Sequence, residues 1–269
     1  MPQIKVNDVE LFYEEKGSGS EVMLFSHGYL MDHTMYDGQI EAFQEQFRCI
    51  TYDHRGHGRS EAVTSSYDLD AIVNDAIALI EALDIAPVHF IGMSTGGFVG
   101  MRIALRRPEL LKSLVLIDTS ANAEDKDKLK QYNLLLKTVN LVGWRLVIGR
   151  VMPILFYEVF LKDSQRQAEV KKWRNIITGH DTKAVTAFAH AIFSRGSVVD
   201  QLKEIRTPTV VIVGKHDAAT PTSYAQTMAD RIHDTRMRVI PDSGHSSPVE
   251  KPRVVAEAMR AFYERVGIL

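Results

Sequence analysis

Short apolar runs alternate along the chain with longer stretches in which apolar residues recur every three or four positions. Runs rich in β-branched residues predict strands at residues 22–25, 49–53, 88–93, 113–118, 209–214 and 237–240. The helical spacing between them predicts helices at residues 35–46, 69–83, 95–106, 221–232 and 253–266. Several of the strands are apolar throughout, which is typical of strands covered on both faces. The pattern therefore predicts βα units and a mostly parallel sheet with helices on both faces.

Two regions depart from this alternation. Residues 4–6 and 10–15 flank the turn-forming pair Asn7 and Asp8, so they predict an antiparallel edge and bring the expected sheet to eight strands. Residues 121–197 contain helical patterning and no strand-like run. We interpret them as a helical cap inserted into an α/β core made of residues 1–120 and 198–269.

The cap is rich in aromatic residues and begins with a run of charges. Its aromatic side chains suit an acyl chain or an aromatic group of a substrate, although packing of the cap onto the core would also explain them. The candidates for a substrate pocket are Trp144, Phe156, Tyr157, Phe160 and Phe193. The charged residues 124–128 (EDKDK) are expected to form a solvated helix start.

Charge and composition narrow the choice of partner. The formal net charge is −2 with both signs interspersed, so there is no basic stripe for nucleic acid or an anionic membrane. No apolar stretch approaches the length of a membrane span, and the first residues lack the apolar core of a signal peptide, so we expect a cytoplasmic protein. The single cysteine, Cys49, lies in an apolar run and is expected to be a buried, inert thiol. No feature of the sequence specifies an oligomeric state.

Residues 92–96 (GMSTG) carry the strongest chemical signal. They follow a predicted strand and open a predicted helix, the context in which a G-x-S-x-G motif presents a nucleophilic serine. A sharp turn there strains the backbone at Ser94 and leaves room for only small residues on either side of it. We therefore expect Ser94 to be a nucleophile.

A serine hydroxyl needs a base, and the base needs a third group to orient it. His245 follows the last predicted strand, at the sheet edge where Ser94 also lies, so it is the expected base. Asp217 follows the preceding strand and gives the chain order Ser, Asp, His. Asp118, at the end of the strand after the nucleophile, is the alternative acid.

The remaining requirement is a pair of donors for the oxyanion. Backbone N–H groups are suitable because the fold fixes them in advance. The strand at 22–25 runs into Ser26, His27 and Gly28, so we expect the N–H of Tyr29 and the N–H of Thr95 to serve.

With these parts in place the chain resembles the α/β-hydrolase superfamily. The resemblance rests on residues 27–28 (HG), 53–60 (DHRGHGRS), 92–97 (GMSTGG), Asp217 and 244–245 (GH), and it covers both flanks of the cap. Within the superfamily the chain is similar to small serine carboxylesterases and lactonases, a group that includes enol-lactonases and cofactor-free perhydrolases. The resemblance implies that residues 53–60 form a loop and not a metal site. No H-x-H-x-D-H run and no third glycine of a dinucleotide motif is present, so we expect neither metal nor cofactor.

The resemblance also narrows the reaction. Serine at position 94 disfavours epoxide hydrolases and haloalkane dehalogenases, which have aspartate there, and Ser246 disfavours carbon–carbon bond hydrolases, which usually have tryptophan. A perhydrolase is only partly matched by Tyr29-Leu30. We expect a carboxylesterase acting on a small-molecule ester, with a lactone, such as an acyl-homoserine lactone or an enol-lactone, as the alternative substrate. A receptor that keeps the triad but turns over little is the alternative from another class.

Overall fold

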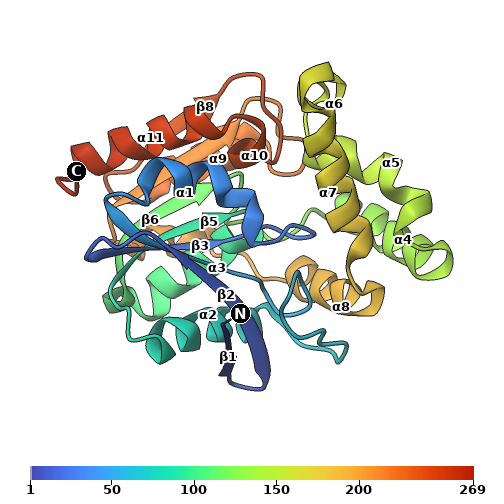
Figure 1. The fold of residues 1–269 in the computed structure, drawn as a ribbon, viewed down its shortest axis with the longest axis horizontal. Coiled ribbons are helices and arrows are strands. Elements are labelled where there is room, and N and C mark those ends of the chain that lie inside the picture. Colours follow the sequence, from blue (N-terminus) through green and yellow to red (C-terminus); the bar gives the residue numbers. More distant parts are fainter. Residues whose placement is uncertain (1) are drawn as a thin grey trace.

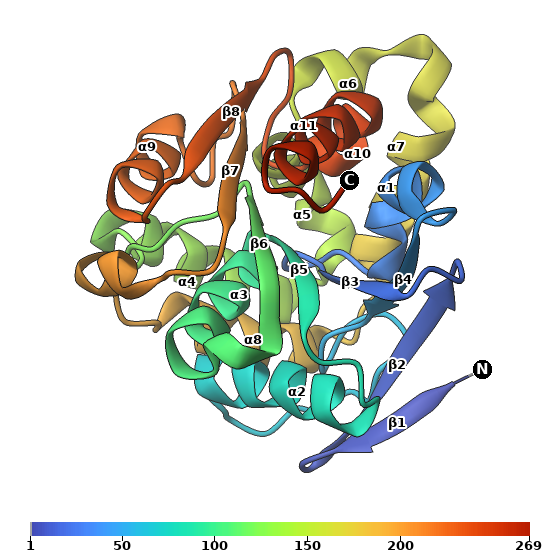
Figure 2. The same cartoon turned by 90° about the vertical axis from the view of Figure 1, so that its left-hand side faces the viewer.

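One eight-stranded sheet runs through the computed structural model, which describes residues 2–269 (Figures 1 and 2). The strands are β1 (Gln3–Val6), β2 (Val9–Lys16), β3 (Glu21–Ser26), β4 (Phe47–Tyr52), β5 (Val88–Met93), β6 (Leu111–Ile117), β7 (Thr209–Gly214) and β8 (Arg236–Ile240). Their order is β1-β2-β4-β3-β5-β6-β7-β8. β1 and β2 pair antiparallel, β2 pairs antiparallel with β4, and the other neighbours are parallel. The predicted mostly parallel sheet with an antiparallel edge is confirmed.

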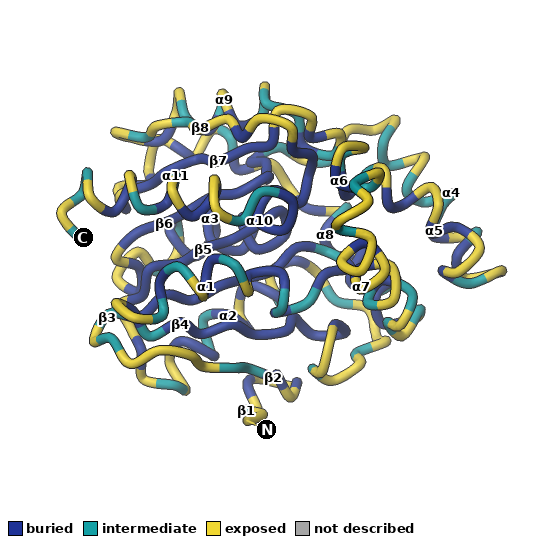
Figure 3. The backbone as a smooth tube through the Cα atoms, turned by 45° about the horizontal axis from the view of Figure 1, so that its top comes forward, coloured by how far each residue is buried: buried dark blue, intermediate teal, exposed yellow. Residues whose placement is uncertain are grey.

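Helices cover both faces of the sheet, as predicted. They are α1 (Asp37–Phe43), α2 (Leu69–Ala82), α3 (Thr95–Arg106), α9 (Thr222–Arg231), α10 (Ser247–Glu250) and α11 (Pro252–Arg265). Residues of α2, α3 and α9 share one apolar cluster, whereas those of α1 and α11 belong to the other. β5 contributes Phe90 to the first cluster and Ile91 to the second, since successive side chains of a strand point to opposite faces. The central strands are accordingly buried along their length (Figure 3).

One predicted helix divides in two. The pattern at residues 35–46 predicts a single helix, but the chain forms a 3-10 turn at His33–Tyr36 and then α1. Asp32 causes the early start, because its side chain accepts a hydrogen bond from the Thr34 N–H as an N-cap.

Five helices lie between β6 and β7: α4 (Lys126–Val142), α5 (Trp144–Leu155), α6 (Glu158–Lys162), α7 (Gln167–Gly179) and α8 (Thr182–Phe193). We call them the inserted helices. Figure 1 shows them gathered to one side of the sheet, with α4 and α5 farthest from it. Within residues 2–269, no helix has both the length and the apolar character needed to cross a membrane. The division of the chain into core and cap remains a prediction.

Cys49 behaves as its sequence context predicts. It lies in β4 and is 1% exposed. Burial raises the pKa of its thiol to about 12, so the thiol stays protonated near neutral pH and is a poor nucleophile.

The turn from β5 into α3 is closely packed against β3. Ser94 stands between the strand and the helix with φ +50° and ψ −109°, a conformation that is strained for a residue with a side chain. A side chain at Gly96 would overlap the carbonyl of Ser26 in β3, and one at Gly92 would overlap the backbone of Gly96. The glycines are therefore required by the close approach of three backbone segments.

This packing predicts a position-specific effect of alanine. Gly96→Ala should lower the free energy of unfolding by roughly 1–3 kcal/mol, because its methyl group has no space beside the Ser26 carbonyl. Gly149→Ala is the matched control. Nothing lies within 4 Å of a methyl group at that exposed position in α5, so it should stabilise by roughly 0.5–1 kcal/mol. Urea unfolding measures both, and equal effects of the two substitutions would contradict the packing argument.

Candidate active site

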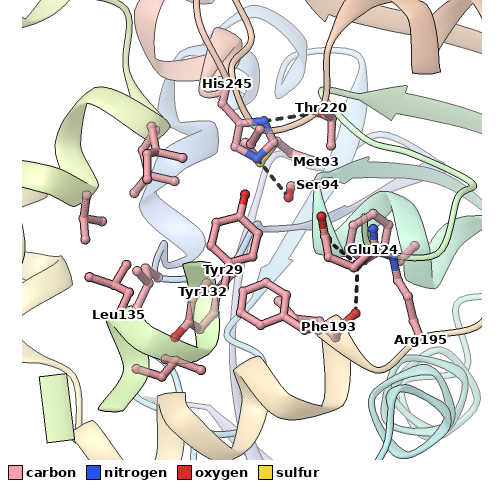
Figure 4. A pocket seen from close by; sticks show the side chains of 18 of the residues that line it. Tyr29, Met93, Ser94, Glu124, Tyr132, Leu135, Phe193, Arg195, Thr220 and His245 are labelled. Atoms are coloured by element: carbon pink, nitrogen blue, oxygen red, sulfur yellow. Dashed lines mark hydrogen bonds and ion pairs between the residues drawn. The ribbon is translucent and has the colours of Figure 1, made fainter. Parts of the chain in front are cut away.

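Ser94, His245 and Asp217 come together at the carboxyl edge of the sheet. Ser94 follows β5, Asp217 follows β7, and His245 follows β8. His245 Nε2 lies 3.0 Å from Ser94 Oγ, and His245 Nδ1 lies 2.9 Å from Asp217 Oδ2. The structure thus joins the three predicted residues in one hydrogen-bonded row (Figure 4 shows Ser94 and His245).

The Asp217 carboxylate is held by donors other than the histidine. The backbone N–H groups of Ala219 and Thr220 donate to Oδ1 at 2.9 and 2.8 Å, and Thr220 Oγ1 donates to Oδ2 at 2.7 Å. A carboxylate only accepts, so His245 Nδ1 carries the proton and Nε2 is left as an acceptor facing Ser94. Burial lowers the pKa of His245, but the charge of Asp217 and the hydrogen bond to it raise it further, and the net pKa lies above the ordinary value.

Asp118 is placed differently from Asp217. It accepts hydrogen bonds from the N–H of Gly214 at 2.7 Å and from the N–H of Ser247 at 2.9 Å. Burial, and then the charge of Asp217, raise its pKa well above the usual range. Asp118 therefore ties the end of β6 to β7 and to α10, and it is Asp217 that lies beside the His245 ring.

The loop carrying Tyr29 is fixed from two sides by histidines. His57 Nε2 accepts from the N–H of Leu30 at 3.2 Å, and His180 Nε2 donates to the carbonyl of Leu30 at 3.1 Å. His180 belongs to the turn between α7 and α8, so the inserted helices take part in holding this loop. Among residues 2–269, neither the N–H of Tyr29 nor that of Thr95 has an acceptor. Both are free to bind a ligand oxygen.

A mainly apolar pocket of about 100 Å³ opens from Ser94 and His245 (Figure 4). Its other walls are formed by Tyr29, Leu30, Met93, Phe98, Glu124, Tyr132, Leu135, Leu136, Trp144, Val151, Ile154, Leu155, Ile192, Phe193, Arg195, Ala219 and Thr220. Trp144 and Phe193, two of the predicted pocket aromatics, are among them. Helices α4 and α5 also contribute Tyr132, Leu135, Leu136, Val151, Ile154 and Leu155, and the other wall residues come from the core and from the two connections of the inserted helices.

The other three predicted pocket aromatics do not line this cavity. Phe156 and Phe160 stack on each other with ring centroids 5.0 Å apart, among the inserted helices. The Tyr157 ring stacks on His216 at 4.0 Å, and its N–H donates to Glu250. Phe156 and Phe160 therefore pack among the inserted helices, and the Tyr157 ring packs on the loop that carries Asp217, which corrects the expected place of these three rings in the pocket.

Glu124 and Arg195 are pocket residues that the sequence analysis missed. The charged opening at 124–128 was expected to be solvated, and Asp125 does cap α4 there. Glu124, however, turns inward and pairs with Arg195 Nη1 at 2.9 Å, with side chains 13% and 4% exposed. No local pattern marks this pair, because the two residues lie 71 positions apart.

The histidines of the 53–60 segment make structural contacts. His57 accepts a hydrogen bond from the N–H of Leu30 in the loop carrying Tyr29, and the His54 ring lies 3.2 Å from Ser26 Oγ. Residues 2–269 hold no group of three or more His, Cys, Asp or Glu side chains arranged for a metal ion. The expectation that the protein uses no metal or cofactor stays a prediction.

Comparisons with known proteins agree with this architecture. Residues 21–252 match the family model described as the alpha/beta hydrolase fold. The chain is 27% identical to 3-oxoadipate enol-lactonase 2 of Acinetobacter baylyi, over 97% of this chain and 96% of the relative. A thermophilic esterase from Thermogutta terrifontis superposes with a TM-score of 0.91 at 28% identity, covering 99% of both chains. The enol-lactonase from Burkholderia xenovorans LB400 superposes with a TM-score of 0.90 at 24% identity, covering 98% of this chain and all of the other. This second superposition shows similarity of fold alone. The chain therefore belongs to the family of the alpha/beta hydrolase fold.

Proposed function

We propose that the protein is a serine hydrolase that cleaves carboxylic esters through an acyl-enzyme formed on Ser94. The observation that carries this proposal is the row of hydrogen bonds from Ser94 Oγ through His245 to Asp217, beside an apolar pocket that Ser94 and His245 line. Relatives named as an esterase and as an enol-lactonase support the same reaction class.

In the acylation half-reaction, His245 Nε2 takes the proton of Ser94 Oγ while the oxygen bonds to the ester carbonyl carbon. Asp217 stabilises the imidazolium that forms and does not itself become protonated. Collapse of the tetrahedral intermediate breaks the bond to the alcohol oxygen, and His245 returns the proton to the leaving alkoxide.

Water completes the cycle by the same route. His245 Nε2 takes a proton from water, the hydroxide oxygen bonds to the acyl carbon, and Ser94 leaves with that proton. In both steps the negative oxygen is stabilised by the N–H groups of Tyr29 and Thr95, which have no acceptor among residues 2–269. Because these donors are held before substrate arrives, little reorganisation accompanies the reaction.

The inserted helices set the substrate class. We propose that they act as a cap, since α4 and α5 supply apolar wall residues of the pocket that Ser94 also lines. Such walls favour a small apolar acyl group in an open-chain ester. The named enol-lactonase relative makes a lactone the second candidate, because opening a lactone uses the same acyl transfer with the leaving alkoxide still attached.

Removing the nucleophile tests the reaction. Ser94→Ala should lower kcat for short and medium acyl esters by roughly 10⁴- to 10⁶-fold, because no alkoxide remains for His245 to activate. Acid release at constant pH, over a panel of open-chain esters and lactones, measures this loss and also ranks the two substrate classes.

Two results would contradict the proposal. Near-normal activity of Ser94→Ala would exclude Ser94 as nucleophile. Thermal stabilisation of the wild type by these compounds without turnover would instead indicate a receptor of the same fold.

The Asp217–His245 contact predicts the pH profile. Activity should fall as pH drops through the pKa of His245, which lies above its ordinary value, because the protonated ring cannot accept the serine proton. Asp217→Asn should reduce kcat by roughly 10⁴-fold and move the acid limb of the profile to lower pH, since the raising charge is gone. Asp118→Asn is the control and should change kcat far less, and a larger loss there than in Asp217→Asn would transfer the orienting role to Asp118.

A further inference from the structure

An ion pair is built into the otherwise apolar wall of the pocket. Glu124 precedes α4 and Arg195 follows α8, so the pair joins the two chain connections of the inserted helices. Both residues line the same cavity as Ser94 (Figure 4). The described acylation and deacylation steps use neither residue.

Arg195 is incompletely bonded although it is buried. Its Nη1 donates to Glu124 and to the carbonyl of Ile192, both at 2.9 Å, and the guanidinium lies 4.0 Å from the Phe98 ring. Its Nε is buried and has no acceptor among the described residues. Only Oε2 of Glu124 is engaged by Arg195, so the carboxylate retains capacity to accept a further hydrogen bond.

The charges of the pair select the kind of group it could bind. A carboxylate on the substrate would be attracted by Arg195 and repelled by Glu124, and an ammonium group would meet the reverse. A neutral group that both accepts and donates matches the two side chains without such opposition. A secondary amide is such a group, and burying one in an apolar wall without partners would be unfavourable.

We propose that Glu124 and Arg195 form a polar subsite that binds a secondary amide in the acyl chain of the substrate. Arg195 donates to the amide carbonyl, and Glu124 accepts from the amide N–H. This inference rests on the proposed ester hydrolysis at Ser94 and specifies its substrate as an N-acylamino ester or lactone. The apolar residues of α4 and α5 then surround the chain beyond the amide.

The test compares two esters of equal length, one with an amide in the acyl chain and one with two methylene groups in its place. The double variant Glu124→Gln/Arg195→Met removes both charges together and leaves no unpaired ion. Its kcat/KM for the amide ester, divided by that for the all-carbon ester, should fall by about 10- to 200-fold relative to wild type. The all-carbon ester is the reference substrate in each variant, because it has no group that could hydrogen-bond to either side chain at that position.

Two further variants make the comparison specific. Glu15→Gln/Arg48→Met removes the half-exposed pair between β2 and β4, and it should leave the ratio unchanged. Arg195→Lys keeps a donor and should retain part of the preference. An unchanged ratio in the Glu124/Arg195 double variant, with both esters slowed equally or only the melting temperature lowered, would make the pair a structural tie and overturn the proposal.

Binding separates this inference from the reaction itself. In the Ser94→Ala background, the amide ester should raise the melting temperature more than the all-carbon ester, and the double variant should abolish the difference. Equal stabilisation by both esters would overturn the subsite. If the wild type hydrolysed neither ester, the proposed function would be contradicted. The difference in melting-temperature shift between the two esters would still show whether the Glu124–Arg195 subsite binds the amide.

Discussion

The close approach of β3 and β5 to the start of α3 is the constraint on which the site depends. Gly96 lies against the carbonyl of Ser26, so the chain can turn from strand to helix within one residue. That turn holds Ser94 in a strained conformation at the sheet edge and leaves the Thr95 N–H at an open helix end. One packing contact thus positions both the proposed nucleophile, Ser94, and one of the two proposed oxyanion donors, the Thr95 N–H.

The other parts of the site reach this edge from separate loops, each held by its own polar contacts. Asp118 bridges β7 and α10, and Glu250 accepts the N–H groups of Gly244 and Ser246 on either side of His245. Burial raises the pKa of Glu250, and these backbone donors oppose the rise. The position of His245 therefore depends on buried carboxyl groups that do not touch its ring.

The inserted helices are coupled to the reacting centre through contacts that cross the pocket. His180 donates to the Leu30 carbonyl in the loop carrying Tyr29, and the Tyr29 hydroxyl donates to the Val185 carbonyl in α8. Glu124 and Arg195 close the base of the insertion. The same helices thus line the pocket beside Ser94 and hold the loop that carries Tyr29, whose N–H is a proposed oxyanion donor.

The sheet, most helices and the row of Ser94, His245 and Asp217 could be predicted because their signals are local. Apolar spacing marks each element, and parallel strands bring their carboxyl ends to one edge. The pocket could not be predicted in the same way. In the sequence, Phe156, Phe160 and Phe193 are equivalent, because each is an aromatic residue of the predicted cap. Tertiary packing decides which of these rings lines the cavity. Glu124 and Arg195 meet only because the five inserted helices between them bring the two ends of the insertion together. The residues next to either one in the sequence give no sign of this contact.

The central claim is that Ser94 becomes acylated during turnover. The direct measurement is mass spectrometry of protein quenched during reaction with a slowly deacylated activated ester, followed by peptide mapping. We expect one added acyl mass on the peptide containing Ser94, and none in Ser94→Ala. Acylation of another residue would contradict this mechanism. So would rapid turnover of the ester if Ser94 were unmodified in every quenched sample.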